Sequence, residues 1–475
     1  MKLSVFDVAA RNPTALALIT TDARLTYAEL AARVSATATR LAAHGLLEPG
    51  PQPVAVVARP GLASVCVLHA LWAYGIATFT LPARLPAEER SAWAARARVR
   101  ATIDPDEVEA LSRVSAPPPP LELDPEAPLA IVPTSGSTGA PKLVVLSRGA
   151  FSAAAQASAA NLPLGPRDRW LLCLPLSHIG GLSILTRCLL SASTVVAFDP
   201  GREGLLARLP ALAARLEREQ VSLVSFVPTV LDALLTLTPP WQPSPALRAV
   251  LLGGAATHAE LLARAQQRGV PVLVTYGLTE SCSQVATTRA GSAPRVAAGL
   301  VSAGPALPGI ELKLDETGRI CVRGPTLCTR FIDGERPIDE QGWLRTEDRG
   351  ELDSAGELFV LGRASDLIIT GGENVDPVRV EAVLASAPGV RKAAVFGVPD
   401  PRFGELVACA LVTDADFAPS RVRTALARVL APHELPRQLA LVAALPELQN
   451  GKLDRTRLRA VVTASLAPWP RSSPD

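Results

Sequence analysis

Hydroxyl side chains, two glycines and a lysine are concentrated between Thr134 and Lys142, in the segment T-S-G-S-T-G-A-P-K. The segment follows an apolar run, Leu129 to Val132, that is typical of a buried strand. Glycines let backbone N–H groups turn towards an anion, hydroxyl groups add hydrogen-bond donors, and the lysine adds a positive charge. This composition predicts a phosphate cradle. A flexible polar surface loop is the alternative for the segment taken alone.

Three other sequence motifs are not matched. The G-x-x-x-x-G-K-[ST] phosphate loop is excluded because only two residues separate Gly139 from Lys142, and Pro141 opposes the helix that would hold the lysine. The chain contains no G-x-S-x-G, which argues against a serine hydrolase. It also contains no G-x-G-x-x-G, which argues against a dinucleotide-dependent oxidoreductase.

Length and composition indicate a globular protein of more than one domain. A chain of 475 residues is too long for one compact core. Its residues are 48% hydrophobic and 19% charged, as in globular proteins rather than disordered or fibrous ones. The net charge is +2 and no basic run stands out, so no nucleic-acid partner is expected.

Cysteine and histidine usage indicates a reducing compartment and gives no sign of a metal centre. The seven cysteines are scattered without a C-x-x-C pair, and the five histidines lack metal-ligand spacing. Asp7 stands where a signal peptide would need apolar residues, and Asp232 interrupts the best candidate span, Val221 to Leu237. We therefore expect a cytoplasmic protein without a membrane span.

The order of apolar runs predicts an α/β fold. Strand-like and helix-like segments alternate, which favours parallel sheets covered by helices. The strand-like runs are Pro53 to Ala58, Val221 to Val227, Val250 to Leu252 and Val272 to Val274, and the helix-like runs are Gly61 to Tyr74 and Leu205 to Glu219. After about residue 300, Gly309 to Arg323 and Gly356 to Gly362 look like short strands of an antiparallel barrel.

We predict a large N-terminal domain (1–363) of helix-covered, mostly parallel sheets plus a small β-barrel. From Val378 the pattern is helix, strand, strand, helix, strand, which predicts a small, mobile α+β C-terminal domain (364–467). The tail, 468–475, is predicted to be disordered.

The loop and six further segments resemble, in order, the motifs of the adenylate-forming superfamily of acyl-CoA ligases, luciferases and peptide-synthetase adenylation domains. The resemblance runs from Leu25–Leu30 to Lys452, nearly the whole chain. It implies ATP, Mg²⁺, CoA and a small-molecule carboxylic acid as the molecules bound. The six segments are Leu174 to Gly181, Gly253 to Ala255, Tyr276 to Glu280, Trp343 to Asp348, Leu361 to Val375 and Leu445 to Asp454.

The resemblance assigns the nucleotide to several of these motifs. Tyr276 would stack on adenine, Thr279 would donate to the α-phosphate, and Glu280 would hold Mg²⁺. A carboxylate suits Mg²⁺, which bridges the phosphate oxygens that leave as pyrophosphate. The implied ATP-binding residues are Thr134, Ser135, Gly136, Ser137, Thr138, Gly139, Lys142, Gly253, Gly254, Ala255, Tyr276, Gly277, Thr279, Asp348 and Arg363.

Asp348 would accept hydrogen bonds from both ribose hydroxyls, and Arg363 would pair with the ribose and phosphate side of the nucleotide. Glu347 stands where the family has glycine, and a solvated acidic turn is the alternative there. The Gly253–Gly254 turn would face adenine, although an ordinary strand-to-helix turn has the same pattern.

The resemblance gives Lys452 the central catalytic role. It would bridge the substrate carboxylate and the α-phosphate, and so offset the repulsion between two anions. A surface lysine is the alternative. The implied catalytic residues are Lys452, His178, Thr279 and Glu280, and the implied acyl-pocket residues are His178, Ile179, Gly180 and Ser283. A simple helix cap is the alternative for His178.

The family's interdomain hinge falls at Ser365 and Asp366, where polar residues can absorb a change of backbone dihedrals between two domain orientations. Gly371 and Gly372 would line a tunnel for the thiol arm of CoA. The smaller domain would thus be a lid that carries both Lys452 and the CoA tunnel. An exposed interdomain linker is the plain alternative.

Within the superfamily, the o-succinylbenzoate–CoA ligases of menaquinone synthesis are the most similar. The resemblance is carried by His178–Leu185, Leu251–Gly254, Tyr276–Gln284 and Ile369–Asn374. Ser177 replaces a common aromatic residue, and Ser147-Arg148-Gly149 lacks the usual Thr-His. A ligase for another aryl or medium-chain acid therefore stays open.

Two other classes remain as rivals. The first is an adenylation module that loads a carrier protein in secondary metabolism. The second is a non-catalytic binding homologue, which should have lost Lys452 or Glu280, and both are present. The oligomeric state is open, a homodimer included.

Overall fold

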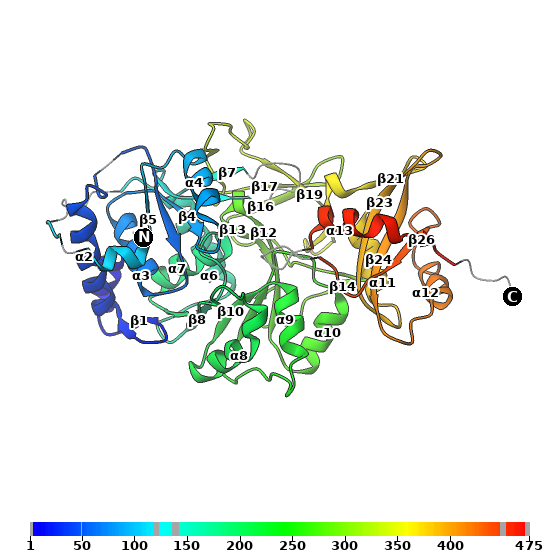
Figure 1. The fold of residues 1–475 in the computed structure, drawn as a ribbon, viewed down its shortest axis with the longest axis horizontal. Helices are drawn as coiled ribbons and strands as arrows, with labels where there is room; N and C mark the ends of the chain where they lie inside the picture. The colour runs from blue at the N-terminus through cyan, green and yellow to red at the C-terminus, as the bar shows by residue number, and fades with distance from the viewer. Residues whose placement is uncertain are drawn as a thin grey trace.

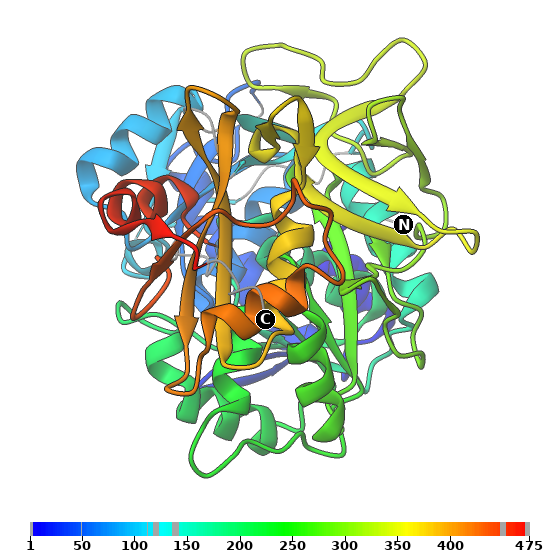
Figure 2. The same cartoon turned by 90° about the vertical axis from the view of Figure 1, so that its right-hand side faces the viewer.

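A computed structural model describes residues 3–48, 50–111, 113–116, 123–134, 142–446 and 453–470 of the chain. Figure 1 shows a large body built by the N-terminal and central elements, with the C-terminal elements gathered at one end. Figure 2 views the molecule from that end. Of the described helices, none is long and apolar enough to cross a membrane. The seven cysteines are buried free thiols.

The first large sheet contains β1 (Leu16–Ile19), β2 (Arg24–Thr26), β8 (Arg169–Leu172), β9 (Thr194–Ala197), β10 (Leu223–Phe226), β11 (Ala249–Leu252), β12 (Val272–Leu278) and β13 (Ser283–Thr287). Its strand order is β13-β12-β11-β10-β8-β9-β1-β2. The strands from β12 to β1 are parallel, and β13 and β2 add antiparallel edges. The expected parallel sheet is therefore confirmed.

The second large sheet contains β3 (Val54–Ala58), β4 (Thr78–Pro82), β5 (Ala101–Ile103), β6 (Pro128–Pro133), β7 (Leu143–Ser147) and β18 (Arg330–Phe331). Its order is β18-β7-β6-β4-β3-β5, with β5, β3, β4 and β6 parallel. Strand β7 runs antiparallel to β6. These two strands therefore flank the segment Thr134 to Lys142, which we call the hydroxyl-rich loop.

Helices cover both sheets: α1 (Val5–Arg11), α2 (Tyr27–Ala43), α3 (Leu62–Ala73), α4 (Ala87–Arg96), α5 (Pro105–Glu109), α6 (Arg148–Asn161), α7 (Ile179–Ser191), α8 (Leu209–Arg218), α9 (Pro228–Leu235) and α10 (Ala259–Gln267). Helix α3 is apolar on all sides and buried from Ser64 to Ala73, as expected for a helix inside a large core. One buried cluster joins residues of α6 and α7 to both sheets.

The helix predicted over Leu205–Glu219 is shorter than expected. Residues Leu206–Arg208 form a 3-10 turn, η1, and the α-helix begins at Leu209. Pro210 occupies the first turn of α8, where the backbone N–H that proline lacks would have no helical partner. The proline ring would clash with a preceding turn of α-helix, so the α-helix cannot extend further towards the N-terminus. The helix then buries Leu209, Leu212 and Leu216 on one face.

The barrel-like part contains β14 (Val296–Ala297), β15 (Leu300–Val301), β16 (Glu311–Leu314), β17 (Arg319–Arg323), β19 (Leu344–Leu352) and β20 (Leu358–Arg363). Strands β16-β17-β19-β20 form an antiparallel sheet in that order, as expected. Short 3-10 turns follow β12 and β20: η2 (Thr279–Ser281) and η3 (Ala364–Asp366).

The C-terminal part contains β21 (Ile368–Thr370), β22 (Glu373–Val375), α11 (Pro377–Ala385), β23 (Val390–Asp400), β24 (Gly404–Thr413), α12 (Pro419–Leu426), β25 (Gln438–Leu441), α13 (Arg455–Val462), η4 (Thr463–Ser465) and β26 (Ala467–Pro468). The predicted order of helix, strand, strand, helix, strand is confirmed over α11 to β25. The strand path β22-β21-β24-β25-β26 has β23 paired to β24.

The tail predicted to be disordered, 468–475, begins with two residues that are ordered. Pro468 pairs with Gln438, and Trp469 is 3% exposed with its indole N–H donating to the Pro419 carbonyl oxygen at 3.1 Å. Burial of a large aromatic side chain offsets the entropy of ordering this short segment. Residues 471–475 lie outside the described part of the chain.

Candidate active site

Tyr276, Asp348 and Arg363 come together from three separate motifs. The Tyr276 hydroxyl donates to Asp348 Oδ2 at 2.8 Å, and Arg363 Nε lies 3.7 Å from Asp348 Oδ1. Asp348 and Arg363 are register partners on β19 and β20, which fixes their separation. Burial, and then the Asp348 charge, raises the pKa of Tyr276 well above its usual value, so its proton stays available for this bond.

The turn after β12 requires unusual backbone. A Cβ on Gly277 would lie 1.7 Å from the Ser283 carbonyl oxygen, so only glycine fits there. Cys282 and Ser283 both have positive φ, 54° and 95°. Non-glycine residues in this region carry strain, which proteins retain mainly where a site needs it. The turn thereby carries Thr279 and Glu280 out of the strand.

Glu280 is a partly buried carboxylate among charges of both signs. Burial raises the pKa of its carboxyl group, Asp348 raises it further, and Arg363 and Lys142 oppose the rise. In the described ranges no group of three or more His, Cys, Asp and Glu side chains is arranged to hold a metal ion. A single carboxylate still fits Mg²⁺, which keeps several waters and takes its other ligands from substrate phosphates.

The base of the hydroxyl-rich loop is held by two hydrogen bonds between its ends. Thr134 N–H donates to the Lys142 carbonyl oxygen at 2.9 Å, and Lys142 N–H donates to Thr134 Oγ1 at 3.0 Å. Lys142 Nζ lies 3.4 Å from Glu335 and 4.5 Å from the centre of the Phe331 ring. The loop residues between, Ser135, Gly136, Ser137, Thr138 and Gly139, lie outside the described residues.

His178 precedes α7, where its backbone carbonyl oxygen accepts from Gly181 and Leu182. Its side chain makes no capping hydrogen bond, which does not favour the helix-cap interpretation. The Gly253–Ala255 turn follows β11, and Gly254 and Ala255 are exposed there. Whether these residues contact a substrate stays a prediction.

Arg187 is a residue that sequence reasoning missed. It lies on α7, is 3% exposed, and donates through Nη2 to Ser283 Oγ at 3.1 Å. Its guanidinium stands 5.4 Å from the centre of the Trp170 ring. Burial lowers its pKa to about 10, and Nε has no partner within the described residues.

Among the described residues, no carboxylate forms a salt bridge with Arg187. The buried guanidinium therefore has no counter-ion from this part of the chain. Such a charge is costly unless a partner satisfies it. The signal in the sequence is one arginine inside the apolar helix pattern Ile179–Ser191. The arrangement brings a positive charge to Ser283, next to the turn that carries Glu280.

The predicted hinge residues lie in η3, directly after β20. Asp366 Oδ2 lies 3.5 Å from Arg455 Nε, and Arg455 Nη2 lies 2.9 Å from Glu381 Oε1. Arg455 begins α13, three residues after Lys452. Lys452 lies outside the described residues. Gly371 and Gly372 form the exposed turn between β21 and β22.

The sequence profile of AMP-binding enzymes matches residues 5–331, and that of the AMP-binding enzyme C-terminal domain matches 379–452. The chain is a member of the AMP-binding enzyme family. A family relative, the 2-succinylbenzoate–CoA ligase of Listeria monocytogenes serotype 4b, is 32% identical over 94% of this chain and 97% of its own length.

Solved structures of AMP-binding enzymes match over nearly the whole chain. The o-succinylbenzoate CoA synthetase (MenE) of Bacillus subtilis in complex with the acyl-adenylate OSB-AMP has a TM-score of 0.81 at 30% identity, covering 97% and 98% of the two chains. The same enzyme with ATP and magnesium ion also scores 0.81. ATP-bound MatB from Rhodopseudomonas palustris scores 0.83 at 25% identity, covering 97% and 99%.

A further complex of the Bacillus subtilis enzyme compares less well. A double mutant bound to its product analogue OSB-NCoA has a TM-score of 0.68 at 29% identity, covering 99% and 100% of the two chains. Identity and coverage hardly differ from those of the OSB-AMP complex, so the lower score indicates a different arrangement of parts. The backbone of this chain is therefore more similar to the complexes with adenylate and ATP than to the complex with OSB-NCoA.

Proposed function

We propose that this adenylate-forming acyl-CoA ligase activates 2-succinylbenzoate and transfers it to CoA, a step of menaquinone synthesis. The observation that carries the choice of acid is Arg187, a buried guanidinium without a described carboxylate partner beside Ser283. The acid has two carboxylates. One must attack ATP, and the other needs a positive partner inside the pocket.

In the first half-reaction the substrate carboxylate attacks the α-phosphorus of ATP and pyrophosphate leaves. Lys452 would offset the negative charge that builds as the two anions meet. Thr279 would donate to the α-phosphate, and Glu280 would hold Mg²⁺ against the departing phosphates. The hydroxyl-rich loop, entered at Thr134, would clamp the same phosphates.

The Tyr276–Asp348–Arg363 arrangement supports the nucleotide end of this site. The Tyr276 ring would stack on adenine next to the exposed Gly254–Ala255 turn. Asp348 would accept from the ribose hydroxyls, with its carboxylate already oriented by the Tyr276 hydroxyl and by Arg363. Preorganised charges lose little free energy to reorganisation when substrate binds.

In the second half-reaction the CoA thiol attacks the acyl carbonyl, a C–S bond forms, and AMP leaves with the former carboxylate oxygen. We propose that residues 364–467 rotate about Ser365 and Asp366 between the two steps. The exposed Gly371–Gly372 turn would then line the path of the thiol arm. His178 and Ile179–Gly180 would flank the acyl group.

Two observations favour keeping another acid in the test. Ser177 replaces an aromatic residue in the acyl motif. ATP-bound MatB has a TM-score of 0.83 against 0.81 for the o-succinylbenzoate CoA synthetase, although its sequence identity is lower, 25% against 30%. Purified protein with Mg²⁺ and ATP should release pyrophosphate with 2-succinylbenzoate faster than with benzoates, malonate or medium-chain fatty acids. Release with one of those acids and none with 2-succinylbenzoate would replace the proposed substrate. Transfer to a phosphopantetheinyl carrier protein and not to CoA would favour a loading module.

A further inference from the structure

An ion pair connects the barrel to the C-terminal part across the hinge segment. Arg349 on β19 and Asp376, which precedes α11, place Nη1 and Oδ1 2.6 Å apart, and their side chains are 20% and 17% exposed. We propose that Arg349 is a positioning residue for the adenylation half-reaction. Its pair with Asp376 stabilises the observed orientation of the C-terminal part and must open before the thioester step. The inference rests on the proposed function, because it requires two half-reactions.

Asp376 is placed to serve this pair rather than its own helix. It occupies the N-cap position of α11, where an aspartate usually accepts a hydrogen bond from the first helical turn. Its side chain makes no such bond. The carboxylate instead contacts Arg349, whose Nε donates to the Thr317 carbonyl oxygen at 3.3 Å. The guanidinium is therefore fixed on the barrel side.

Close packing of α11 brings the carboxylate to the arginine. A small apolar cluster joins Leu300, Phe359 and Leu361 to Ala382 of α11. Gly362 has φ of 111°, and a Cβ there would lie 2.9 Å from Val378 Cγ2. Glycine at residue 362 avoids this contact and adopts the positive φ without strain, which favours the close approach of strand β20 and α11. Docking of the helix thus partly buries Asp376 opposite Arg349.

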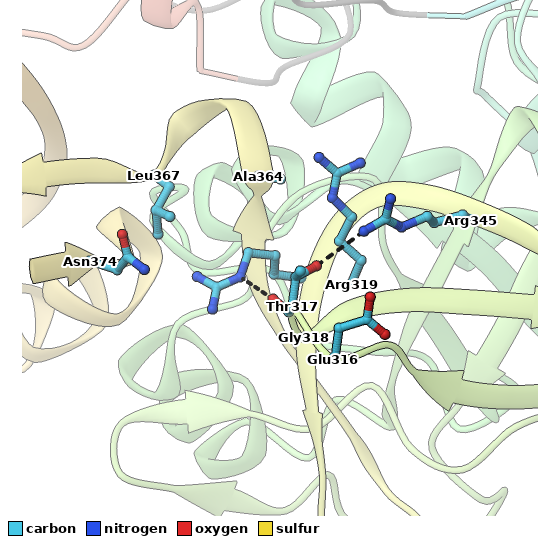
Figure 3. A pocket seen from close by; sticks show the side chains of 9 residues that line it. Glu316, Thr317, Gly318, Arg319, Arg345, Ala364, Leu367 and Asn374 are labelled. Carbon is cyan, nitrogen blue, oxygen red and sulfur yellow. Dashed lines mark hydrogen bonds between the residues drawn. The ribbon is translucent and has the colours of Figure 1, made fainter.

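An open cleft of about 600 Å³ lies beside the pair. Figure 3 shows Leu367 and Asn374 on one side of it and Gly318, Arg319 and Arg345 on the other. Beside this cleft the two sides are joined by the Arg349–Asp376 pair and by the apolar cluster around Ala382. A single ion pair can then shift the balance between orientations measurably.

The two partners should not be equivalent. Burial raises the pKa of Asp376 and Arg349 opposes that rise, so the carboxylate depends on its partner to stay charged. Removing Arg349 leaves a partly buried carboxylate without a counter-charge, which is the costlier loss. Removing the charge of Asp376 leaves an arginine that keeps its carbonyl partner and reaches solvent.

The test measures the two half-reactions separately in the full-length enzyme. Acyl-adenylate formation is followed in a single turnover with ATP, Mg²⁺ and 2-succinylbenzoate, and CoA is then added to preformed adenylate. Arg349→Gln should slow the first step about tenfold and leave the second unchanged or faster. Asp376→Asn should slow it less. The double variant should recover part of the loss, because the unpaired charge is gone.

Arg345→Gln is the matched control. Arg345 lies on the same strand and lines the same cleft, but its partner at 2.5 Å is Asp315, also in the barrel. Both half-reactions of this variant should stay within about threefold of wild type. An equal loss in both steps for Arg349→Gln, or no loss in either, would overturn the proposal.

A second measurement separates failure of the proposal from failure of the proposed function. If wild type forms no adenylate with any acid, the proposed function is wrong. The role of the Arg349–Asp376 pair in the orientation of the two parts is then tested in substrate-free protein. Dyes on cysteines introduced at the exposed Ser91 and Ser420 report the orientation of the two parts by energy transfer. Arg349→Gln should change the transfer efficiency and Arg345→Gln should not. Identical efficiencies in all three proteins would contradict the role of the pair.

Discussion

The hydroxyl of Tyr276 donates a 2.8 Å hydrogen bond to the carboxylate of Asp348, and the two residues are 72 positions apart in the chain. Tyr276 lies near the end of β12 in the first large sheet, and Asp348 lies on β19 of the barrel. The bond therefore ties the turn that carries Thr279 and Glu280 to the strand proposed to hold ribose. Both proposed nucleotide contacts are oriented before ATP arrives.

Tyr276→Phe keeps the aromatic ring and removes this bond. Because a hydrogen bond to a charged group contributes about 1.5–3 kcal/mol, we expect the KM for ATP to rise about tenfold with kcat little changed. Tyr276→Ala should raise it further, since the stacking surface is also lost. Pyrophosphate release at varied ATP concentration measures both. Equal KM values for wild type and Tyr276→Phe would show that the bond does not orient Asp348 for nucleotide.

Arg187→Met should remove the preference for a diacid. The matched pair of substrates is 2-succinylbenzoate and 4-oxo-4-phenylbutanoate, which lacks the ring carboxylate. We expect kcat/KM for the diacid to fall about 100-fold and that for the monoacid to change little, since only the diacid loses a charge-assisted contact.

Arg148→Met is the control for Arg187. Arg148 is also a buried arginine with a pKa lowered by burial to about 10, but it donates to the Trp72 carbonyl oxygen. Its loss should affect both acids alike. A diacid preference that survives in Arg187→Met would remove the main support for 2-succinylbenzoate.

Arg455→Met should weaken adenylation without weakening ATP binding. Arg455 links the start of α13 to Asp366 and Glu381, so it fixes the segment that follows Lys452 relative to the hinge. For Arg455→Met we expect slower single-turnover adenylation with an unchanged Kd for ATP. Lys452→Ala should have the same effect in a stronger form and abolish adenylation. Arg457→Met, two residues on and exposed, should behave as wild type. Normal adenylation by Lys452→Ala would refute the catalytic role itself.

The acid-side stability of the large N-terminal part should depend on His69. This histidine is 5% exposed, and burial lowers its pKa to about 4. The folded state favours the neutral form of His69. The resulting contribution to the free energy of unfolding is complete above about pH 6.5 and is lost as the pH falls towards 4, at up to about 1.4 kcal/mol per pH unit. His69→Gln should show a smaller fall in Tm between pH 7 and 5, whatever its Tm at pH 7. An equal fall in Tm for wild type and His69→Gln would show that other groups cause the pH dependence.

The sequence predicted the elements better than the contacts between them. Buried strands such as Val250–Leu252 and the helix after Gly61 are local patterns, and glycine or proline at their ends limits their length. Tyr276, Glu280 and Asp348 lie in recognisable motifs. Their proximity to one another was implied only by resemblance.

Contacts that depend on tertiary packing were not predicted. Arg187 looks like one charged residue on an apolar helix, and such side chains usually extend to solvent. The Arg349–Asp376 pair depends on how α11 docks against β20 after the hinge. Trp469 is flanked by prolines and looks like tail until its pocket beside Pro419 is known. In each case the deciding partner is remote in sequence.

The most direct test of the account is the product balance of the complete reaction. Purified protein is incubated with 2-succinylbenzoate, CoA, ATP and Mg²⁺, and the products are quantified by mass spectrometry. We expect AMP, pyrophosphate and 2-succinylbenzoyl-CoA in equal amounts, and accumulation of acyl-adenylate when CoA is omitted. Formation of ADP and phosphate, or of no thioester from this acid, would contradict the account.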